Sequence, residues 1–373
     1  MTNAKVYTAI GLMSGTSLDG VDAALLETDG GEYVRPLGFV TMPYAPSVRD
    51  EIRAVFGVKN RRDPKLLDAE KLVTFKHIEA IEELMRQTGR SAKDIDVIGF
   101  HGQTVYHAPM ERVTIQIGDG DLMARECRID VVDDFRIDDV KAGGEGAPLA
   151  PVYHAARMKD AQLDLPVAVL NIGGVANVTW IGEGEGNIIA FDTGPGNALM
   201  DDWIKSRTGK PFDEDGRYAA HGTPIDAMLR EWSAHPYFMR KPPKSLDRDQ
   251  WDIAALGQVT QNMENISTED GAATLLRFTG DMIVRSVEHM PAKPKAWFAC
   301  GGGRHNKALM KYLNEKLDGA VKTVDDLGWN GDATEAECFG YLAVRKLLYL
   351  PISFPGTTAA PQPMTGGTLH KAK

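Results

Sequence analysis

The sequence predicts an α/β protein built from two similar halves. Strand-like and helix-like segments alternate along the whole chain, which is typical of α/β folds. The same series of elements occurs twice: two strands joined by a turn of small residues, a helix, a buried strand, and a turn rich in glycine and polar residues. A length of 373 residues also favours two domains over one. We therefore expect two related α/β units facing each other, with a ligand between them.

The composition narrows the class of function. The net charge of −10 and the pI of about 5.4 argue against a nucleic-acid-binding protein, which normally carries a basic face. The three cysteines form no CxxC pair and indicate neither a zinc knuckle nor a disulfide framework, so a reducing compartment fits best. No apolar run approaches the roughly 18 residues of a membrane span, and no signal-peptide pattern is present. We expect a cytoplasmic protein with a small-molecule substrate, and neither nucleic acid nor membrane as a partner.

The first elements are two strands, VYTAIGLM (6–13) and VDAALLETD (21–29). The turn between them, 14–20, consists mostly of glycine and hydroxyl-bearing residues. A turn needs only one or two such residues. The surplus indicates backbone N–H groups left open for an anion.

A long helix is predicted from Pro64 to Thr88. Proline suits the first turn of a helix, and Gly89 suits its C-terminal stop. His77 falls on the apolar stripe of this helix, so we expect it to be a hydrogen-bonded core residue.

The rest of the first half contains two further strands and a glycine-rich segment. DVIGFHGQTV (96–105) is predicted to be a buried strand ending in a turn, and IDVVDDF (129–135) another strand. KAGGEGAP (141–148) is the expected crossover to the second domain. The predicted division is lobe I over 1–140, lobe II over 141–347, and a C-terminal tail, about 348–373, returning to lobe I. Within this tail PGTTAAPQPMTGG (355–367) is expected to be a loop.

The second half repeats the pattern. PVAVLNIGGVANVTWI (166–181) reads as strand, glycine turn and strand, and NIIAFDTGPGN (187–197) contains a third strand. Ser267 to Met290 is predicted to be a helix with an S-x-x-D cap. KAWFACGGGRHN (295–306) is a strand that enters a glycine-rich turn, which is followed by another helix.

The common phosphate-binding motifs are missing. Neither G-x-x-x-x-G-K-[ST] nor G-x-G-x-x-G occurs, so a nucleotide would have to bind in another way. Three glycine turns supply one: 14–20, Gly173–Gly174 and Gly301–Gly303. Bare backbone N–H groups in such turns can donate hydrogen bonds to a close phosphate, and a helix N-terminus favours an anion.

Nine motifs together resemble those of the anhydro-N-acetylmuramic acid kinase family, within the sugar kinase, actin and Hsp70 superfamily. In chain order they are GLMSGTSLDGVD, HGQTV, DFR, GGEGAPL, NIGGVANVT, FDTGPGN, FDEDG, CGGGRHN and GDATEAECFGYLA. The resemblance spans nearly the whole chain. It implies a two-lobed actin/hexokinase-like fold of duplicated ribonuclease H-like domains with an interlobe cleft, ATP and Mg²⁺ as cofactors, and a cytoplasmic homodimer. The implied product is N-acetylmuramic acid 6-phosphate, made from 1,6-anhydro-N-acetylmuramic acid during peptidoglycan recycling.

The resemblance also implies which residues bind ATP. The first turn would line the phosphates, Gly173–Gly174 would be its partner from the other lobe, and the third turn would hold the adenosine. The implied ATP-binding residues are Gly15, Thr16, Ser17, Leu18, Asp19, Gly20, Val21, Asp22, Gly173, Gly174, Gly301, Gly302, Gly303 and Asn306.

Asp192 is the catalytic candidate. From its position alone, at the end of a strand and before a helix, it could equally be an N-cap residue. The resemblance makes it the base that activates the water attacking C1 of the sugar. A base of this kind contributes about 10²–10⁴-fold to the rate.

Phosphoryl transfer requires charge neutralisation, usually by Mg²⁺, and Glu335 is the candidate for the metal shell, either directly or through a water. Its neighbour Glu337 points about 200° away at helical spacing, so both cannot face the same site. A solvated helix glutamate is the alternative for either.

Four residues are candidates for sugar binding: His101, Gln103, Thr104 and Arg136. The first three follow a buried strand, where ligands of α/β proteins bind, although His101 could instead be a structural residue. Arg136 could bind the lactyl carboxylate through two hydrogen bonds, or pair with Asp133 or Asp134. Lys244–Ser245 lies on a predicted loop and could face the substrate or be solvated, and we expect it to be solvated.

Three other functions remain open from the sequence. A levoglucosan-type kinase would act on an anhydro sugar without the acetamido and lactyl groups, and Arg136 favours the amino sugar. A non-catalytic, actin-like nucleotide-binding protein would not need Asp192 or HGQTV. A simple glycoside hydrolase with two carboxylates would need no ATP.

Overall fold

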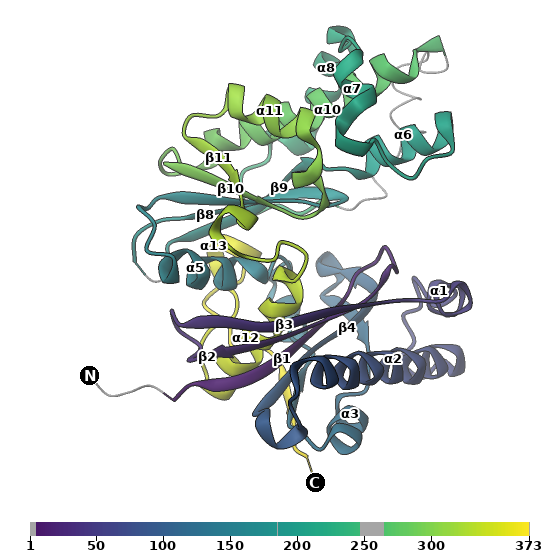
Figure 1. The fold of residues 1–373 in the computed structure, drawn as a ribbon, viewed down its shortest axis with the longest axis vertical. Coiled ribbons are helices and arrows are strands. Elements are labelled where there is room, and N and C mark those ends of the chain that lie inside the picture. Colours follow the sequence, from purple (N-terminus) through teal and green to yellow (C-terminus); the bar gives the residue numbers. More distant parts are fainter. Residues whose placement is uncertain (1–4, 185, 247–264, 373) are drawn as a thin grey trace. The chain divides into compact units, whose positions relative to one another are not determined.

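The computed structural model describes residues 5–184, 186–246 and 265–372. They form two compact units (Figure 1): Met1–Gln162 together with Ala333–Lys373, and Leu163–Asp332. The sequence placed the division at 140/141 and 347/348. The glycine-rich segment 141–148, predicted to be the crossover, lies within unit 1, and the chain enters unit 2 at Leu163.

The sheet of unit 1 has the strand order β12-β6-β4-β1-β2-β3, and β5 pairs with β4. The first three strands are antiparallel neighbours, whereas β4 is parallel to both β1 and β6. The strands are β1 (Tyr7–Ser14), β2 (Gly20–Thr28), β3 (Val34–Pro43), β4 (Val97–Ala108), β5 (Val113–Ile117), β6 (Val131–Asp133) and β12 (Thr368–His370).

The sheet of unit 2 has the order β11-β10-β7-β8-β9. Here too the first three strands in sequence are antiparallel, and the next two are parallel to the first. The strands are β7 (Val167–Ile172), β8 (Val175–Ile181), β9 (Ile188–Pro195), β10 (Ala296–Cys300) and β11 (Ala320–Thr323). The two sheets thus share one connectivity, which confirms the predicted duplication of an α/β unit.

Helices cover these sheets. In unit 1 they are α1 (Pro46–Arg53), α2 (Pro64–Thr88), α3 (Gly120–Cys127), α4 (Ile137–Ala142), α5 (Ala150–Asp160), α12 (Thr334–Leu347) and α13 (Pro355–Thr358). In unit 2 they are α6 (Ala198–Thr208), α7 (Arg217–His221), α8 (Asp226–Ser233), α10 (Thr268–Arg285) and α11 (Lys307–Lys316). None of the helices that the structure describes is long and apolar enough to span a bilayer.

The ends of α2 are fixed by local signals. The Asp63 side chain accepts a hydrogen bond from the Lys65 N–H at 2.9 Å, and Gly89 ends the helix with a φ of 66°. His77 is buried, and its Nδ1 donates to the Val73 carbonyl at 2.8 Å. The sequence predicted these helix ends and this role for His77, and both predictions are confirmed.

Helix α12 lies directly on the sheet of unit 1. A Cβ at Gly11 of β1 would overlap the Ala336 carbonyl, and one at Gly99 of β4 would overlap the Phe339 carbonyl. Both glycines are therefore needed for this close packing. It brings the first turn of α12, with Glu335, towards the ends of β1 and β4.

Helix α5 is held to α12 by a buried group of polar residues. Arg157 of α5 forms a 3.1 Å ion pair with Glu337 of α12, and Tyr153 also donates to this carboxylate. These contacts explain why both helices belong to unit 1.

Three predicted elements differ in extent. The strand over 96–105 continues to Ala108, and β6 stops at Asp133 because Asp134 has a φ of 53°. The segment 355–367, predicted to be a loop, contains the short helix α13; beyond it Thr368 to His370 pair with β6.

Candidate functional site

The loop between β1 and β2 leaves backbone groups open. Thr16, Ser17 and Asp19 are exposed, and within the described part of the chain the N–H groups of Thr16 and Ser17 donate no hydrogen bond. Leu18 anchors the loop: its side chain is 1% exposed and its N–H donates to the Gly15 carbonyl at 3.1 Å. This is the open loop that the sequence predicted.

The glycines of this loop have different roles. A Cβ at Gly20 would overlap the Met42 carbonyl, so Gly20 is required by the pairing of β2 with β3. A Cβ at Gly15 would meet only the Ser17 Oγ, at an ordinary 3.6 Å. The fold therefore does not require glycine at position 15, whereas a ligand close to the backbone would.

Four polar residues of unit 1 gather near the first turn of α12. Asp22 is paired with Met13 across the strands, and Met13 packs in the same cluster as the apolar side of α12. The His101 ring lies against Phe339 of α12, with ring centroids 4.5 Å apart. Desolvation raises the pKa of Glu335, nearby Arg136 lowers it, and Asp22 raises it further.

His101 and Arg136 contact each other directly. Arg136 Nε donates to His101 Nε2 at 3.0 Å, and His101 Nδ1 donates to the Gly102 carbonyl at 2.8 Å. Burial, and then the Arg136 charge, hold the pKa of His101 well below its usual value. His101 is therefore a neutral imidazole with its proton on Nδ1.

Arg136 is half-buried. Its Nη1 donates to the Gly146 carbonyl at 2.7 Å. The alternative of a pair with Asp133 or Asp134 is not realised among the described residues, and Asp133 pairs instead with His370 at 2.9 Å.

The two glutamates of α12 lie in different environments, as their spacing on the helix predicted. Glu337 is buried against Arg157, whereas Glu335 is exposed. Glu337 is therefore a structural residue, and Glu335 is the one open to a ligand.

Gln103 does not fit its predicted role as a sugar contact. Its side chain is fully buried; Oε1 accepts from the Ser14 hydroxyl at 2.7 Å and Nε2 donates to the Thr104 carbonyl at 3.2 Å. The Ser14 hydroxyl in turn accepts from the Tyr44 hydroxyl at 3.0 Å. Gln103 thus braces the start of the β1–β2 loop, while Thr104 is only partly buried.

In unit 2, a row of polar side chains crosses the sheet. Cys300, Asn171, Asn177 and Asp192 are in register on β10, β7, β8 and β9. Residues in register point to the same face of a sheet. The sequence analysis missed Asn171; its signal is the symmetry of NIGGVAN, in which two asparagines flank the glycine turn.

The glycine turns of unit 2 meet at one end of this sheet. The N–H groups of Gly196 and Asn197 donate to the carbonyls of Gly174 and Gly173 at 2.9 and 2.7 Å. Gly174 is exposed, and its own N–H donates no hydrogen bond in the part of the chain described. The fold therefore brings the second turn to the start of α6.

The third turn is built around Gly301 and Gly303. A Cβ at Gly301, whose φ is 73°, would overlap Asn171, and one at Gly303 would overlap Ile172. Both glycines are thus required by packing against β7, whereas Gly302 is exposed and faces no such constraint.

Two polar residues hold the third turn. The buried Arg304, which the sequence analysis missed, forms ion pairs with Asp325 at 2.7 Å and Asp332 at 2.9 Å. The predicted ATP ligand Asn306 caps α11, its Oδ1 accepting from the Leu309 N–H at 3.0 Å.

Asp192 does not end its strand, because β9 continues to Pro195, and Asn197 is the N-cap of α6. The N-cap alternative for Asp192 is therefore wrong. Its Oδ2 accepts from the Leu246 N–H at 2.7 Å, and its N–H donates to the Lys244 carbonyl at 3.0 Å. Lys244 is 4% exposed, so the expectation of a solvated lysine is also wrong.

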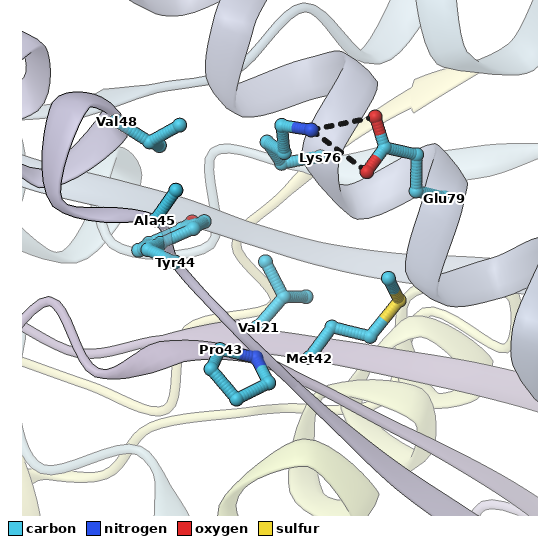
Figure 2. A pocket seen from close by; sticks show the side chains of 8 residues that line it. All are labelled: Val21, Met42, Pro43, Tyr44, Ala45, Val48, Lys76 and Glu79. Carbon is cyan, nitrogen blue, oxygen red and sulfur yellow. Dashed lines mark hydrogen bonds and ion pairs between the residues drawn. The ribbon is translucent and has the colours of Figure 1, made fainter.

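A hollow of about 120 Å³ lies elsewhere in unit 1 (Figure 2). An ion pair of 2.7 Å between Lys76 and Glu79 lies at one side of its mostly apolar wall. Among the predicted site residues only Val21 lines it. It is therefore distinct from the clusters around α12 and the glycine turns.

Known proteins give a consistent picture of the chain's relationships. The profile of the anhydro-N-acetylmuramic acid kinase family matches residues 7–372. An anhydro-N-acetylmuramic acid kinase of Rhizorhabdus wittichii is 48% identical over 97% of this chain and 98% of its own. That of Zymomonas mobilis is 46% identical over 97% and 99%.

Solved structures resemble the chain more distantly. The activator of the 2-hydroxyisocaproyl-CoA dehydratase from Clostridium difficile has a TM-score of 0.49 and 13% identity, over 92% of this chain and 96% of that one. A glucokinase of the ROK family from Streptomyces griseus has a TM-score of 0.42 and 12% identity, over 90% and 99%. The relationship therefore rests on the sequence matches, and this chain belongs to the anhydro-N-acetylmuramic acid kinase family.

Proposed function

We propose that this protein is an ATP-dependent kinase that opens the 1,6-anhydro ring of 1,6-anhydro-N-acetylmuramic acid and phosphorylates O6. The products are N-acetylmuramic acid 6-phosphate and ADP, in peptidoglycan recycling. The observation that carries the proposal is the family match over residues 7–372, with relatives of that name at 46% and 48% identity.

The reaction consumes one water. The water oxygen bonds to C1 as the C1–O6 bond breaks, and O6 bonds to the γ-phosphorus as the bond from that phosphorus to the β,γ-bridging oxygen breaks. The Asp192 carboxylate takes the water proton. The hydrogen bond from the Leu246 N–H supports this role, because it fixes the orientation of the carboxylate.

ATP would bind through main-chain groups. We assign the phosphates to the Gly15–Asp22 loop and to Gly174, and the adenosine to Gly301–Gly303. Support comes from the open N–H groups of Thr16 and Ser17, and from Gly15 and Gly302, where the fold itself does not require glycine. Asn306 would act through α11, which it caps.

Glu335 would hold Mg²⁺, and the Asp22 charge, which raises the pKa of Glu335, adds to the negative potential at this carboxylate. The exposed carboxylate suits a hard cation. Among the described residues no group of three or more His, Cys, Asp or Glu side chains could hold a metal alone. Magnesium fits, because it is usually held by one or two carboxylates together with substrate phosphates, whose charge it neutralises.

Arg136 and Thr104 would bind the sugar. His101 is 4% exposed and both its ring nitrogens are engaged, so it would hold the Arg136 guanidinium in place rather than contact the sugar. Arg136 has no contacting carboxylate among the described residues, so its charge suits the lactyl carboxylate of the substrate. A cytoplasmic homodimer remains part of the proposal, and light scattering of the purified protein would test the dimer.

The central test is ATP turnover with 1,6-anhydro-N-acetylmuramic acid, with mass analysis of the product. We expect the sugar to gain one water and one phosphate, and no product without nucleotide. Faster turnover of levoglucosan would reassign the substrate, and ring opening without ATP would make the protein a hydrolase.

A second test addresses the base. Asp192→Asn should bind ATP and sugar with unchanged affinity and lose about 10²–10⁴-fold in kcat. An unaffected rate would reject Asp192 as the base.

A further inference from the structure

The segment from Tyr237 to Leu246 is fastened to β9 at Asp192. The Tyr237 hydroxyl donates to the Asp192 carbonyl at 2.7 Å, and the Asp192 N–H donates to the Lys244 carbonyl at 3.0 Å. The Leu246 N–H then donates to Asp192 Oδ2 at 2.7 Å. One residue of β9 thus makes three hydrogen bonds with a single covering segment: it accepts two and donates one.

The two ends of this segment are joined by the Lys244 side chain. Its Nζ donates to the Tyr237 carbonyl at 3.3 Å and lies 4.7 Å from the centre of the Tyr237 ring. It also lies 5.9 Å from the Phe191 ring, next to Asp192 in sequence. Lys244 therefore packs between the covering segment and the strand.

A lysine in this position is costly to the fold. Lys244 is 4% exposed, and no ion pair joins it to a carboxylate in the part of the chain described. Burial, followed by the charges of Arg285 and Arg240, lowers the pKa of Lys244 to about 8, whereas the negative charge of Asp192 raises it. A buried, unpaired ammonium group destabilises a protein. Its presence suggests a role beyond stability.

We propose that Lys244 is a positioning residue for the reaction: it fastens the Tyr237–Leu246 segment so that the Leu246 N–H orients the Asp192 carboxylate. This inference rests on the proposed function, in which Asp192 is the base. The ammonium charge also favours the ionised form of Asp192, which is the form that accepts a proton.

The sign of the pH effect follows from this charge. A base is active when it is deprotonated, so kcat rises with pH through its pKa. Removing a nearby cation raises that pKa and moves the acid limb of kcat to higher pH. Among the described residues, the other titratable groups that act on Lys244 are Arg240 of the covering segment, Arg285 at the end of α10, and His289 just beyond it; substitution of Lys244 leaves these groups in place.

The experiment compares three variants: Lys244→Met, Lys244→Arg, and Lys293→Met as a matched control. Lys293 is exposed and pairs with Asp318 at 2.6 Å in the same unit. For Lys244→Met we expect kcat to fall about tenfold or more, KM for both substrates to change less than twofold, and the acid limb to move to higher pH. Lys244→Arg should keep the acid limb in place, and Lys293→Met should match the wild type.

Two readouts separate positioning from a purely structural role. The Tm of Lys244→Met should be equal to or above the wild-type value, because an apolar side chain replaces a buried charge that no carboxylate of the described residues pairs with. Hydrogen exchange at the Asp192 and Leu246 amides should accelerate about tenfold, and this requires no turnover. A raised KM with unchanged kcat would make Lys244 a substrate contact, and unchanged exchange would overturn the proposal. Wild-type turnover by Asp192→Asn would instead show that Asp192 is not the base. The hydrogen-exchange result would still show whether Lys244 fastens the segment.

Discussion

Nε of Arg136 donates a hydrogen bond to Nε2 of His101 across 3.0 Å. The contact commits His101 to accept at Nε2, so its proton must lie on Nδ1, where it meets the Gly102 carbonyl. It also fixes the plane of the guanidinium, whose Nη1 is held by the Gly146 carbonyl. A histidine and an arginine 35 positions apart in sequence thus form one rigid, positively charged element of unit 1.

Arg136→Lys tests whether this element recognises the lactyl carboxylate. Lysine keeps the charge but loses the fixed donor geometry. We expect KM for 1,6-anhydro-N-acetylmuramic acid to rise about tenfold to a hundredfold, as for a lost hydrogen bond to a charged group, with KM for ATP unchanged. Arg86→Lys is the control, because Arg86 lies exposed on α2 and pairs with Glu83. An equal rise in KM for ATP would contradict a sugar-side role.

The glycines provide a second test, because only some are required by the fold. Gly15→Ala and Gly302→Ala should leave Tm nearly unchanged, since a Cβ meets only ordinary contacts at 3.6 and 3.7 Å. Each substitution should raise KM for ATP about tenfold, because the added methyl group would prevent one close contact between the main chain and the nucleotide.

Gly20→Ala is the structural counterpart. Its Cβ would overlap the Met42 carbonyl, so we expect about 1–3 kcal/mol of destabilisation by denaturant unfolding. If the Gly15→Ala variant instead lost stability and kept its KM for ATP, then Gly15 would be required for folding and not for ATP binding.

The two glutamates of α12 should respond in opposite ways. Glu335→Gln removes an exposed carboxylate, so we expect unchanged stability and a higher Mg²⁺ concentration for half-maximal rate. Glu337→Gln removes the charged partner of the buried Arg157, which should cost about 3–5 kcal/mol of stability. Titration of the rate with Mg²⁺ and unfolding in urea would measure the two effects. A normal Mg²⁺ requirement in Glu335→Gln would remove Glu335 from the metal site.

The sequence predicted the elements whose signals are local. Both ends of α2 follow from Asp63, Pro64 and Gly89. The first two strands of each unit follow from the turn of small residues that joins them. The assignment of α12 to unit 1 could not be predicted in this way. It depends on Gly11 and Gly99, far away in sequence, which let this helix lie on that sheet.

The site residues show the same limit. The acidic neighbours of Arg136 in sequence suggested an ion pair, but its partner is His101 of β4. KPPKSLDR is polar and reads as a solvated loop, yet Lys244 is buried because Tyr237 and Phe191 cover it. Burial of a polar side chain depends on residues brought together by the fold, and local composition does not contain that information.

Buried neutral histidines should make the protein sensitive to acid. Burial lowers the pKa of His77 to about 4, from an unfolded value near 6.5. Below pH 6.5 the unfolded chain binds a proton that the folded chain does not, so stability falls with pH until about pH 4. Over that window this residue alone contributes about 3 kcal/mol.

His77→Leu should keep the contact with Phe100 and flatten the dependence of stability on pH between 7 and 4. Urea unfolding at several pH values measures the slope, and Lys71→Met, at an exposed position of α2, is the control. A slope as steep in His77→Leu as in the wild type would show that other groups, such as the buried His154, dominate the acid response.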